Sequence, residues 1–179
     1  MDDKRHRFEA QVLPHLDAAY RFARWLTRSP RDADDVVQDA VLRAFRGFDA
    51  LRGADVKAWL LAIVRNCHAS ACRAELRRAQ VPLPGEHSPE APLVSDAPDP
   101  EGAAIAGDEQ RALARLVAAL PAEQREVLLL RELEELSYRE IAMVTGMPIG
   151  TVMSRLARAR AALRALWQQQ AGGESREVR

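Results

Sequence analysis

The sequence predicts an all-α protein built from two small helical domains joined by a flexible linker. Apolar residues recur every three or four positions over most of residues 7–78 and 108–167, as they do in amphipathic helices. Between these blocks, residues 80–108 are acidic, rich in proline and almost free of large apolar side chains, so they bury too little surface to fold. We therefore expect domains at 1–79 and 109–170, a linker at 80–108 and a disordered tail at 171–179.

Charge is distributed unevenly along the chain. The overall formal charge is zero, but residues 1–78 carry +4, residues 79–108 carry −6 and residues 109–179 carry +2. Two mildly basic blocks flank an acidic connector, so the pI of the whole chain is a poor guide to its partners. The sequence has no long apolar run and no signal peptide, so we expect a cytoplasmic protein without a membrane span. Two cysteines do not make a disulfide framework.

The first domain reads as three helices. Helical spacing predicts the first over Arg7–Thr27, ended by Ser29-Pro30. The second runs over Asp32–Arg46, with acids in its first turn where the helix dipole favours them. A loop over Phe48–Asp55 then leads to a third helix over Val56–Arg78.

The outward face of the second helix carries two large apolar side chains among polar ones. Gln38, Leu42 and Phe45 cluster there, flanked by Asp35 and Asp39. Such a patch indicates a protein-binding surface. The alternative is that another helix of the same domain covers it, and the pattern alone leaves both open.

The third helix is strongly basic. Lys57, Arg65 and Arg73 lie along it, and Asn66 occupies a mid-helix position where asparagine is a mediocre helix former. The asparagine is a weak indication that its amide has a function.

The second domain begins with helices predicted over Asp108–Leu120 and Pro121–Glu135 and ends in a helix-turn-helix. Ser137 and Glu140 have the spacing of a capping box at a helix start. Gly146 suits the end of that helix and Pro148 the start of the next. Two helices joined by a short turn with glycine predict duplex DNA binding.

The final helix divides into two faces. Its apolar stripe is Val152, Leu156, Ala159, Leu163 and Leu166. Thr151, Ser154, Arg155 and Arg158 lie on the opposite side, where hydroxyls and arginines suit contacts to base edges and phosphates in the major groove. The alternative is an amphipathic helix with a solvated basic face.

Both blocks resemble a known family. DADDVVQDAVLRAF and AWLLAIVRN in the first domain, and LPAEQREVLLLRELEELSYREIAMVTGMPIGTVMSRLARARAALR in the second, resemble extracytoplasmic-function (ECF) RNA polymerase sigma factors. The likeness covers nearly all of the chain outside the linker and the last dozen residues. It implies the domains called sigma region 2 and sigma region 4, and an alternative sigma factor that binds core RNA polymerase and directs promoter-specific initiation.

The resemblance also implies residue roles. Asp35, Gln38, Asp39, Leu42 and Phe45 would dock on core polymerase. Arg52, Lys57, Arg65, Asn66 and Arg73 would capture the opened −10 element, with a flipped base in the loop Asp49–Asp55. Thr151, Ser154, Arg155 and Arg158 would read the −35 element as duplex, and an anti-sigma factor would regulate the protein.

The chain departs from the family pattern in two places. The family usually has Tyr-Arg where this chain has Leu61-Ala62, which removes an aromatic ring and a cation from the helix expected to face the melted strand. Met153 replaces a commoner lysine at the flank of the recognition helix, a change expected to weaken phosphate contact more than base choice.

Other chemistry is not indicated. Cys67, His68 and Cys72 lack paired metal-ligand spacing, so we expect no metal site, with a redox-sensing thiol as the remaining alternative. No catalytic constellation stands out, and we expect neither enzymatic activity nor a cofactor. Two further functions stay open: a stand-alone DNA-binding regulator, and a sigma mimic that sequesters an anti-sigma partner.

Overall fold

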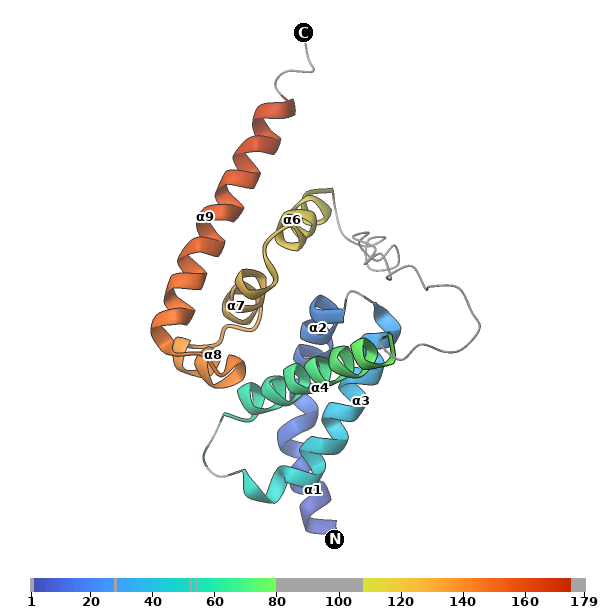
Figure 1. The fold of residues 1–179 in the computed structure, drawn as a ribbon. Coiled ribbons are helices and arrows are strands. Elements are labelled where there is room, and N and C mark those ends of the chain that lie inside the picture. Colours follow the sequence, from blue (N-terminus) through green and yellow to red (C-terminus); the bar gives the residue numbers. More distant parts are fainter. Residues whose placement is uncertain (1, 28, 52, 54, 80–107, 175–179) are drawn as a thin grey trace, which may run out of the picture. The chain divides into compact units, whose positions relative to one another are not determined.

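The computed structural model describes residues 2–27, 29–51, 53, 55–79 and 108–174. The chain divides into two compact units, Met1–Ala97 and Pro98–Arg179. All regular secondary structure in the described residues is helical, as Figure 1 shows. The predicted all-α fold with two helical domains is therefore confirmed. Residues 80–107 of the predicted linker lie outside the described residues, and Asp108 begins a helix.

The first unit is a helical bundle in its described part. Its elements are α1 (Asp2–Val12), η1 (Leu13–His15), α2 (Leu16–Thr27), α3 (Pro30–Gly47), η2 (Phe48–Ala50) and α4 (Val56–Ala79). Helices α2, α3 and α4 pack against one another, and α1 contacts α4. Among the largest fully buried side chains are Phe22 of α2 and Leu60, Leu61 and Val64 of α4.

The single first helix predicted over Arg7–Thr27 is wrong. The chain forms α1, then the 3-10 turn η1, then α2, with Pro14 at the start of η1. Proline has no N–H to donate and its ring clashes with the carbonyl four residues earlier, so a continuous α-helix cannot pass through it. The Leu16 N–H donates to the Leu13 carbonyl instead, and the chain enters α2 from this tighter turn.

The buried faces of α2 and α3 carry several small side chains. Ala19 and Ala23 of α2 and Ala33, Ala40 and Ala44 of α3 are fully buried. Side chains of this size let two helix backbones approach closely, because the distance between helix axes depends on the residues at the contact. Ser29 caps α3 by accepting a hydrogen bond from the Asp32 N–H.

The second unit consists of four helices in its described part. They are α6 (Asp108–Ala118), α7 (Ala122–Glu132), α8 (Tyr138–Thr145) and α9 (Ile149–Glu174). Helix α7 packs on both α8 and α9 and buries Val127, Leu128, Leu129 and Leu130. Arg125 of α7 donates from Nη1 to the Ala118 carbonyl at 2.7 Å, which joins the end of α6 to α7.

The last helix is longer than expected. Helix α9 continues to Glu174, so residues 171–174 are helical where the sequence predicted a disordered tail. Gln168, Gln169, Gln170 and Ala171 are acceptable helix formers that follow the helix without a proline. Residues 175–179 lie outside the described residues. In the part of the chain that the structure describes, no helix has the length and apolar character needed to cross a membrane.

Candidate functional site

The helix-turn-helix of the second unit begins with a complete capping box. The Ser137 N–H donates to Glu140 Oε2 at 2.6 Å, and the Glu140 N–H donates to Ser137 Oγ at 3.3 Å. Two amides at the helix start that have no intrahelical partner are therefore satisfied reciprocally. The predicted start of α8 is confirmed.

The turn between α8 and α9 has the predicted geometry. Gly146 ends α8 with φ 70° and ψ 16°, and its N–H donates to the Ala142 carbonyl. A left-handed conformation of this kind strains any residue with a Cβ, so glycine is the residue that fits here. The Pro148 carbonyl then accepts hydrogen bonds from the N–H groups of Thr151 and Val152, which starts α9.

The two faces of α9 are as the sequence predicts over its first three turns. Val152, Leu156 and Ala159 are buried against the rest of the unit, whereas Leu163 and Leu166 are half-buried. On the outer side Ser154 and Arg158 are exposed and Thr151 and Arg155 are half-buried. The four predicted reading residues therefore share one accessible side of one helix.

Arg155 is held by contacts within its own unit. One terminal nitrogen, Nη2, lies 2.7 Å from Glu123 Oε2 at the start of α7, and the other, Nη1, donates to the sulfur of Met147 in the turn. The arginine side chain keeps 23% of its surface exposed. Sequence reasoning missed Glu123, because nothing near residue 123 marks it as a neighbour of residue 155.

Arg158 and Arg160 differ in their surroundings. Arg158 has no ion-pair partner among the described residues, so its guanidinium is free for an outside anion. Arg160 pairs with Glu132 at 2.6 Å, and the hydrogen bond to that carboxylate raises the pKa of Arg160. Met153 is 52% exposed at the position where the family resemblance implies a lysine.

The outward face of α3 in the first unit presents apolar surface to solvent. Leu42 is 52% exposed, and Asp35 and Gln38 are exposed beside it. Asp39 is half-buried and accepts from both Nε and Nη2 of Arg43, at 3.0 and 2.8 Å. Four of the five predicted docking residues are therefore exposed to solvent. The fifth, Asp39, is half-buried and paired with Arg43 of the same helix.

Phe45 stands between the two interpretations that the sequence left open. Its residue is 38% exposed, but its ring meets the Phe8 ring of α1 edge-to-face, with centroids 5.1 Å apart. A helix of the same unit therefore covers part of Phe45 and leaves the rest accessible. Neither Leu42 nor Gln38 is covered in this way.

The basic helix α4 separates the predicted −10 residues. Asn66 and Arg73 are exposed and, at about 100° per residue, fall on one side of the helix. Arg65 is half-buried at the edge of that side, whereas Lys57, nine residues before Asn66, lies on the opposite side. Arg52 lies outside the described residues.

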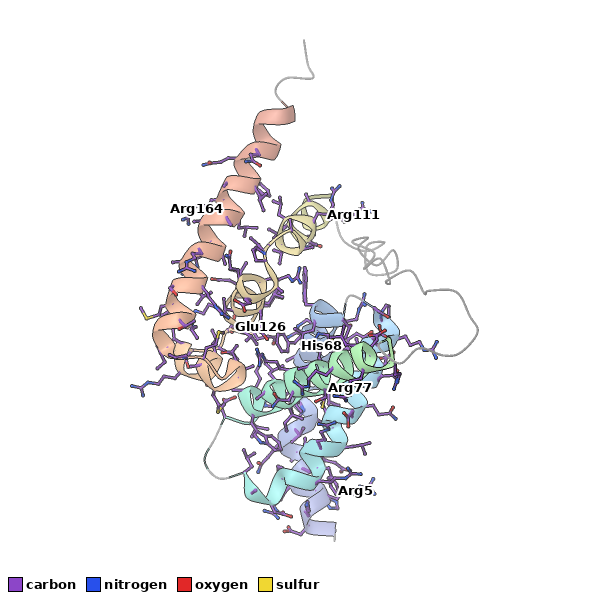
Figure 2. The ribbon with its side chains drawn as sticks, in the orientation of Figure 1. Arg5, His68, Arg77, Arg111, Glu126 and Arg164 are labelled. Carbon is purple, nitrogen blue, oxygen red and sulfur yellow. The ribbon has the colours of Figure 1, made fainter. Side chains whose placement is uncertain are left out.

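Arg77 extends the same stripe and was not among the predicted site residues. It is exposed near the C-terminal end of α4, where Figure 2 labels it. It follows Asn66 by eleven residues, which at about 100° per residue returns to the same side of the helix. Helical spacing could have identified it. The stripe of Asn66, Arg73 and Arg77 is one polar, cationic edge.

Leu61 belongs to the core of the first unit. It is 0% exposed, so it packs inside the bundle rather than on the surface expected to face a melted strand. Ala62, the next residue, is half-buried. The departure at Leu61 therefore lies in the packing of the unit, and its expected effect on the strand-facing surface stays a prediction.

The cysteines occupy different environments. Cys67 is buried on α4, and burial, followed by a hydrogen bond with Asp39, raises the pKa of its thiol to about 11. Cys72 is exposed, with its sulfur 3.6 Å from Nε2 of His68. No group of three or more histidine, cysteine, aspartate or glutamate side chains with metal-site geometry occurs among the described residues. Because its raised pKa keeps the Cys67 thiol protonated, Cys67 is a poor nucleophile.

Comparisons with known proteins cover both units. Residues 12–79 match the family model of Sigma-70 region 2, and residues 110–163 match that of Sigma-70, region 4. The ECF RNA polymerase sigma factor SigM of Mycobacterium tuberculosis is 39% identical over 165 residues, which span 89% of this chain and 76% of SigM. The chain belongs to the ECF RNA polymerase sigma factor family. The ECF sigma-E factor of Escherichia coli is 33% identical over 137 residues, which span 74% of this sigma factor and 72% of that relative.

Solved structures agree with this assignment. The sigma factor RpoE of Bartonella quintana, in complex with the anti-sigma factor NepR, superimposes with a TM-score of 0.70 at 29% identity, over 90% of this chain and 97% of that one. CnrH, in complex with the cytosolic domain of CnrY, gives a TM-score of 0.62 at 27% identity, over 92% of this chain and 90% of that one. The protein is an alternative sigma factor that directs promoter-specific transcription initiation by RNA polymerase, and the family is one of initiation factors rather than enzymes.

Proposed function

We propose that this sigma factor reads the −35 element with the outer side of α9. Thr151, Ser154, Arg155 and Arg158 would enter the major groove, where arginine makes bidentate hydrogen bonds to guanine and hydroxyls contact bases or phosphates. Two observations support this assignment: the four residues share one accessible side, and Arg158 has no ion-pair partner in the described residues.

The outward face of α3 is the proposed binding site for core RNA polymerase. It comprises Asp35, Gln38, Asp39, Leu42 and Phe45. The observation that carries the proposal is Leu42, a leucine that leaves 52% of its surface in water on a face opposite the buried alanines of the same helix. Exposed apolar surface with a polar border is typical of a protein contact. Asp39 would contribute through Arg43, which it holds in place.

The melted −10 strand would lie along α4. Asn66 and Arg73 are the proposed contacts, with Arg65 at the edge and Arg77 added on the evidence of its position. Exposed cations along one side track a phosphate backbone, and a polar amide among them suits a base edge. Lys57 and Arg52 would act at the preceding loop, which leads into α4.

We propose functional domains at 1–79 and 109–170, with residues 80–108 as an acidic linker between them and 171–179 as a tail of no assigned function. The protein would act in the cytoplasm, where core polymerase and promoter DNA are. An anti-sigma factor is the proposed regulator, because RpoE was solved in complex with the anti-sigma factor NepR. CnrH was also solved with a protein partner, the cytosolic domain of CnrY.

Run-off transcription with core polymerase and a library of promoter fragments tests these assignments. Leu42→Ala should reduce transcription from every promoter, because it weakens polymerase binding. Arg158→Ala should reduce it in a promoter-dependent way, by about 5- to 150-fold for a contact worth about 1–3 kcal/mol.

Matched controls make each result specific. Leu76→Ala removes another exposed leucine, 63% exposed, from α4. Arg164→Ala removes an exposed arginine of α9, labelled in Figure 2, that lies about 120° around the helix from Arg158 at about 100° per residue. Equal losses for Leu42→Ala and Leu76→Ala would contradict the polymerase face. Equal losses for Arg158→Ala and Arg164→Ala across all promoters would contradict base reading by Arg158.

A further inference from the structure

The N-terminal helix α1 holds the aromatic residue at the end of the α3 face. Phe8 is 5% exposed and lies between two rings from the end of α3 and from η2. Its centroid is 5.1 Å from that of Phe45 at an interplanar angle of 86°, and 5.4 Å from that of Phe48 at 83°. Both are edge-to-face contacts, the geometry in which the positive edge of one ring meets the negative face of another.

Lys4 closes the same cluster from one turn earlier in α1. Its Nζ lies 5.1 Å from the centroid of the Phe45 ring and 2.7 Å from Oδ2 of Asp49 in η2. Arg7 adds a longer contact to the other oxygen of Asp49, at 3.6 Å. The lysine side chain is 28% exposed, so its ammonium is shielded from water more than an ordinary surface lysine. A cation held over a ring face favours one orientation of the ring.

These contacts restrict Phe45 and cover only part of it. The residue keeps 38% of its surface open while Phe8 and Lys4 occupy its other sides. Fixing a side chain before association lowers the entropy that binding must remove, and this raises affinity without a new contact. The match to Sigma-70 region 2 begins at residue 12, so all of α1 before Val12 lies ahead of it.

We propose that α1 is part of the polymerase-binding face, with Lys4 and Phe8 as positioning residues for Phe45. This inference rests on the proposed role of the α3 face in binding core RNA polymerase. Lys4 holds the ring through the cation–π contact and is itself held by Asp49. Phe8 holds the ring by the edge-to-face contact from inside the bundle.

A double-mutant cycle on core polymerase affinity tests the coupling between Lys4 and Phe45. Lys4→Met keeps the apolar stem and removes the ammonium. It should weaken binding of the full chain to core polymerase by about two- to fivefold, which corresponds to a cation–π contact of about 0.5–1 kcal/mol. In a Phe45→Ala background the same substitution should have no effect, because the ring that the lysine positions is gone. Lys4→Arg should retain the affinity.

The chain offers a matched control on the same helix. Arg5 pairs with Glu9 within α1, so Arg5→Met removes the same charge without touching Phe45 or Asp49 (Figure 2). It should leave the affinity unchanged. A loss for Lys4→Met that persists in the Phe45→Ala background, or that Arg5→Met reproduces, would overturn the positioning role. So would the absence of any loss.

The same measurements separate this inference from the function it rests on. Leu42 lies on the α3 face, and the contacts described above for Lys4 are with Phe45 and Asp49 rather than with Leu42. If Leu42→Ala and Phe45→Ala both leave the affinity unchanged, the α3 face is not the polymerase site and the proposed function fails with the inference. If they weaken binding and Lys4→Met does not, the inference alone fails. Thermal unfolding of each variant verifies that the first unit remains folded.

Discussion

The two proposed binding surfaces of this sigma factor are built in different ways. In the second unit, the helix-turn-helix is fixed by neighbours in sequence: Ser137 with Glu140, Gly146 with Ala142, and Pro148 with Thr151. In the first unit, the end of the α3 face is fixed by Phe8 and Lys4, which belong to α1 and lie far from Phe45 in the sequence. A local motif sets its own geometry, whereas a face assembled from separate helices depends on the packing of the whole bundle.

The largest expected effect is a loss of stability of the first unit, which tests whether its binding face depends on the packing of the whole bundle. Leu61→Ala removes a fully buried side chain from the core of α4 and should destabilise the first unit by about 2–5 kcal/mol, because it deletes packing and leaves a cavity. Leu76→Ala, at a leucine that is 63% exposed, should change stability by less than about 0.5 kcal/mol. Thermal or urea unfolding of the full chain measures both, and similar destabilisation by the two would show that α4 is not packed as described.

A smaller effect sharpens the comparison in the second unit. Gly146→Ala places a Cβ on a residue with φ 70°, where no atom lies within 4 Å of it, so the whole cost is backbone strain of about 1–2 kcal/mol. Gly150→Ala adds a Cβ into equally open space in the first turn of α9, without a positive φ. It should be neutral or stabilising by up to about 1 kcal/mol. Opposite signs in an unfolding experiment are the expected outcome, and equal destabilisation would contradict the strained turn.

The smallest effect concerns the ion pair between Arg155, on the proposed reading side of α9, and Glu123 of α7. Glu123→Gln removes a carboxylate 2.7 Å from Arg155, so the affinity for a random-sequence duplex at low salt should rise by about two- to threefold, as expected for an exposed ion pair worth under about 1 kcal/mol. Fluorescence anisotropy with the full chain measures it. Glu132→Gln is the control, because it removes the same charge from the partner of Arg160. An equal gain in DNA affinity for the two variants would show that the change in net charge causes it, and not the release of Arg155.

The sequence predicted the local features well. The division into two helical units, the capping box at Ser137, the left-handed Gly146 and the inward stripe from Val152 to Ala159 were all read from spacing, and the structure confirms them. Each depends on contacts within one or two helical turns. Periodicity and capping residues report on contacts at that range.

Long-range packing accounts for most of what the sequence did not predict. In α4, Leu61 is fully buried and Ala71 is exposed, a difference that depends on the helices packed around α4 rather than on spacing along it. The contacts of Phe8 with Phe45 and of Glu123 with Arg155 join different helices, and spacing along one helix carries no signal for them. The break at Pro14 is different, because proline alone was sufficient to predict it.

The buried alanines of α2 and α3 have a consequence for how this protein can change over evolutionary time. Ala19, Ala23, Ala33, Ala40 and Ala44 are fully buried where helices meet. A valine at any of these sites would force the helices apart, at a cost of about 1–3 kcal/mol from a stability that totals only about 5–15 kcal/mol in typical domains. The outward side chains of α9 carry no such penalty. If α9 reads the promoter as proposed, substitutions that alter promoter preference can accumulate there while the bundle with the proposed polymerase-binding face stays the same.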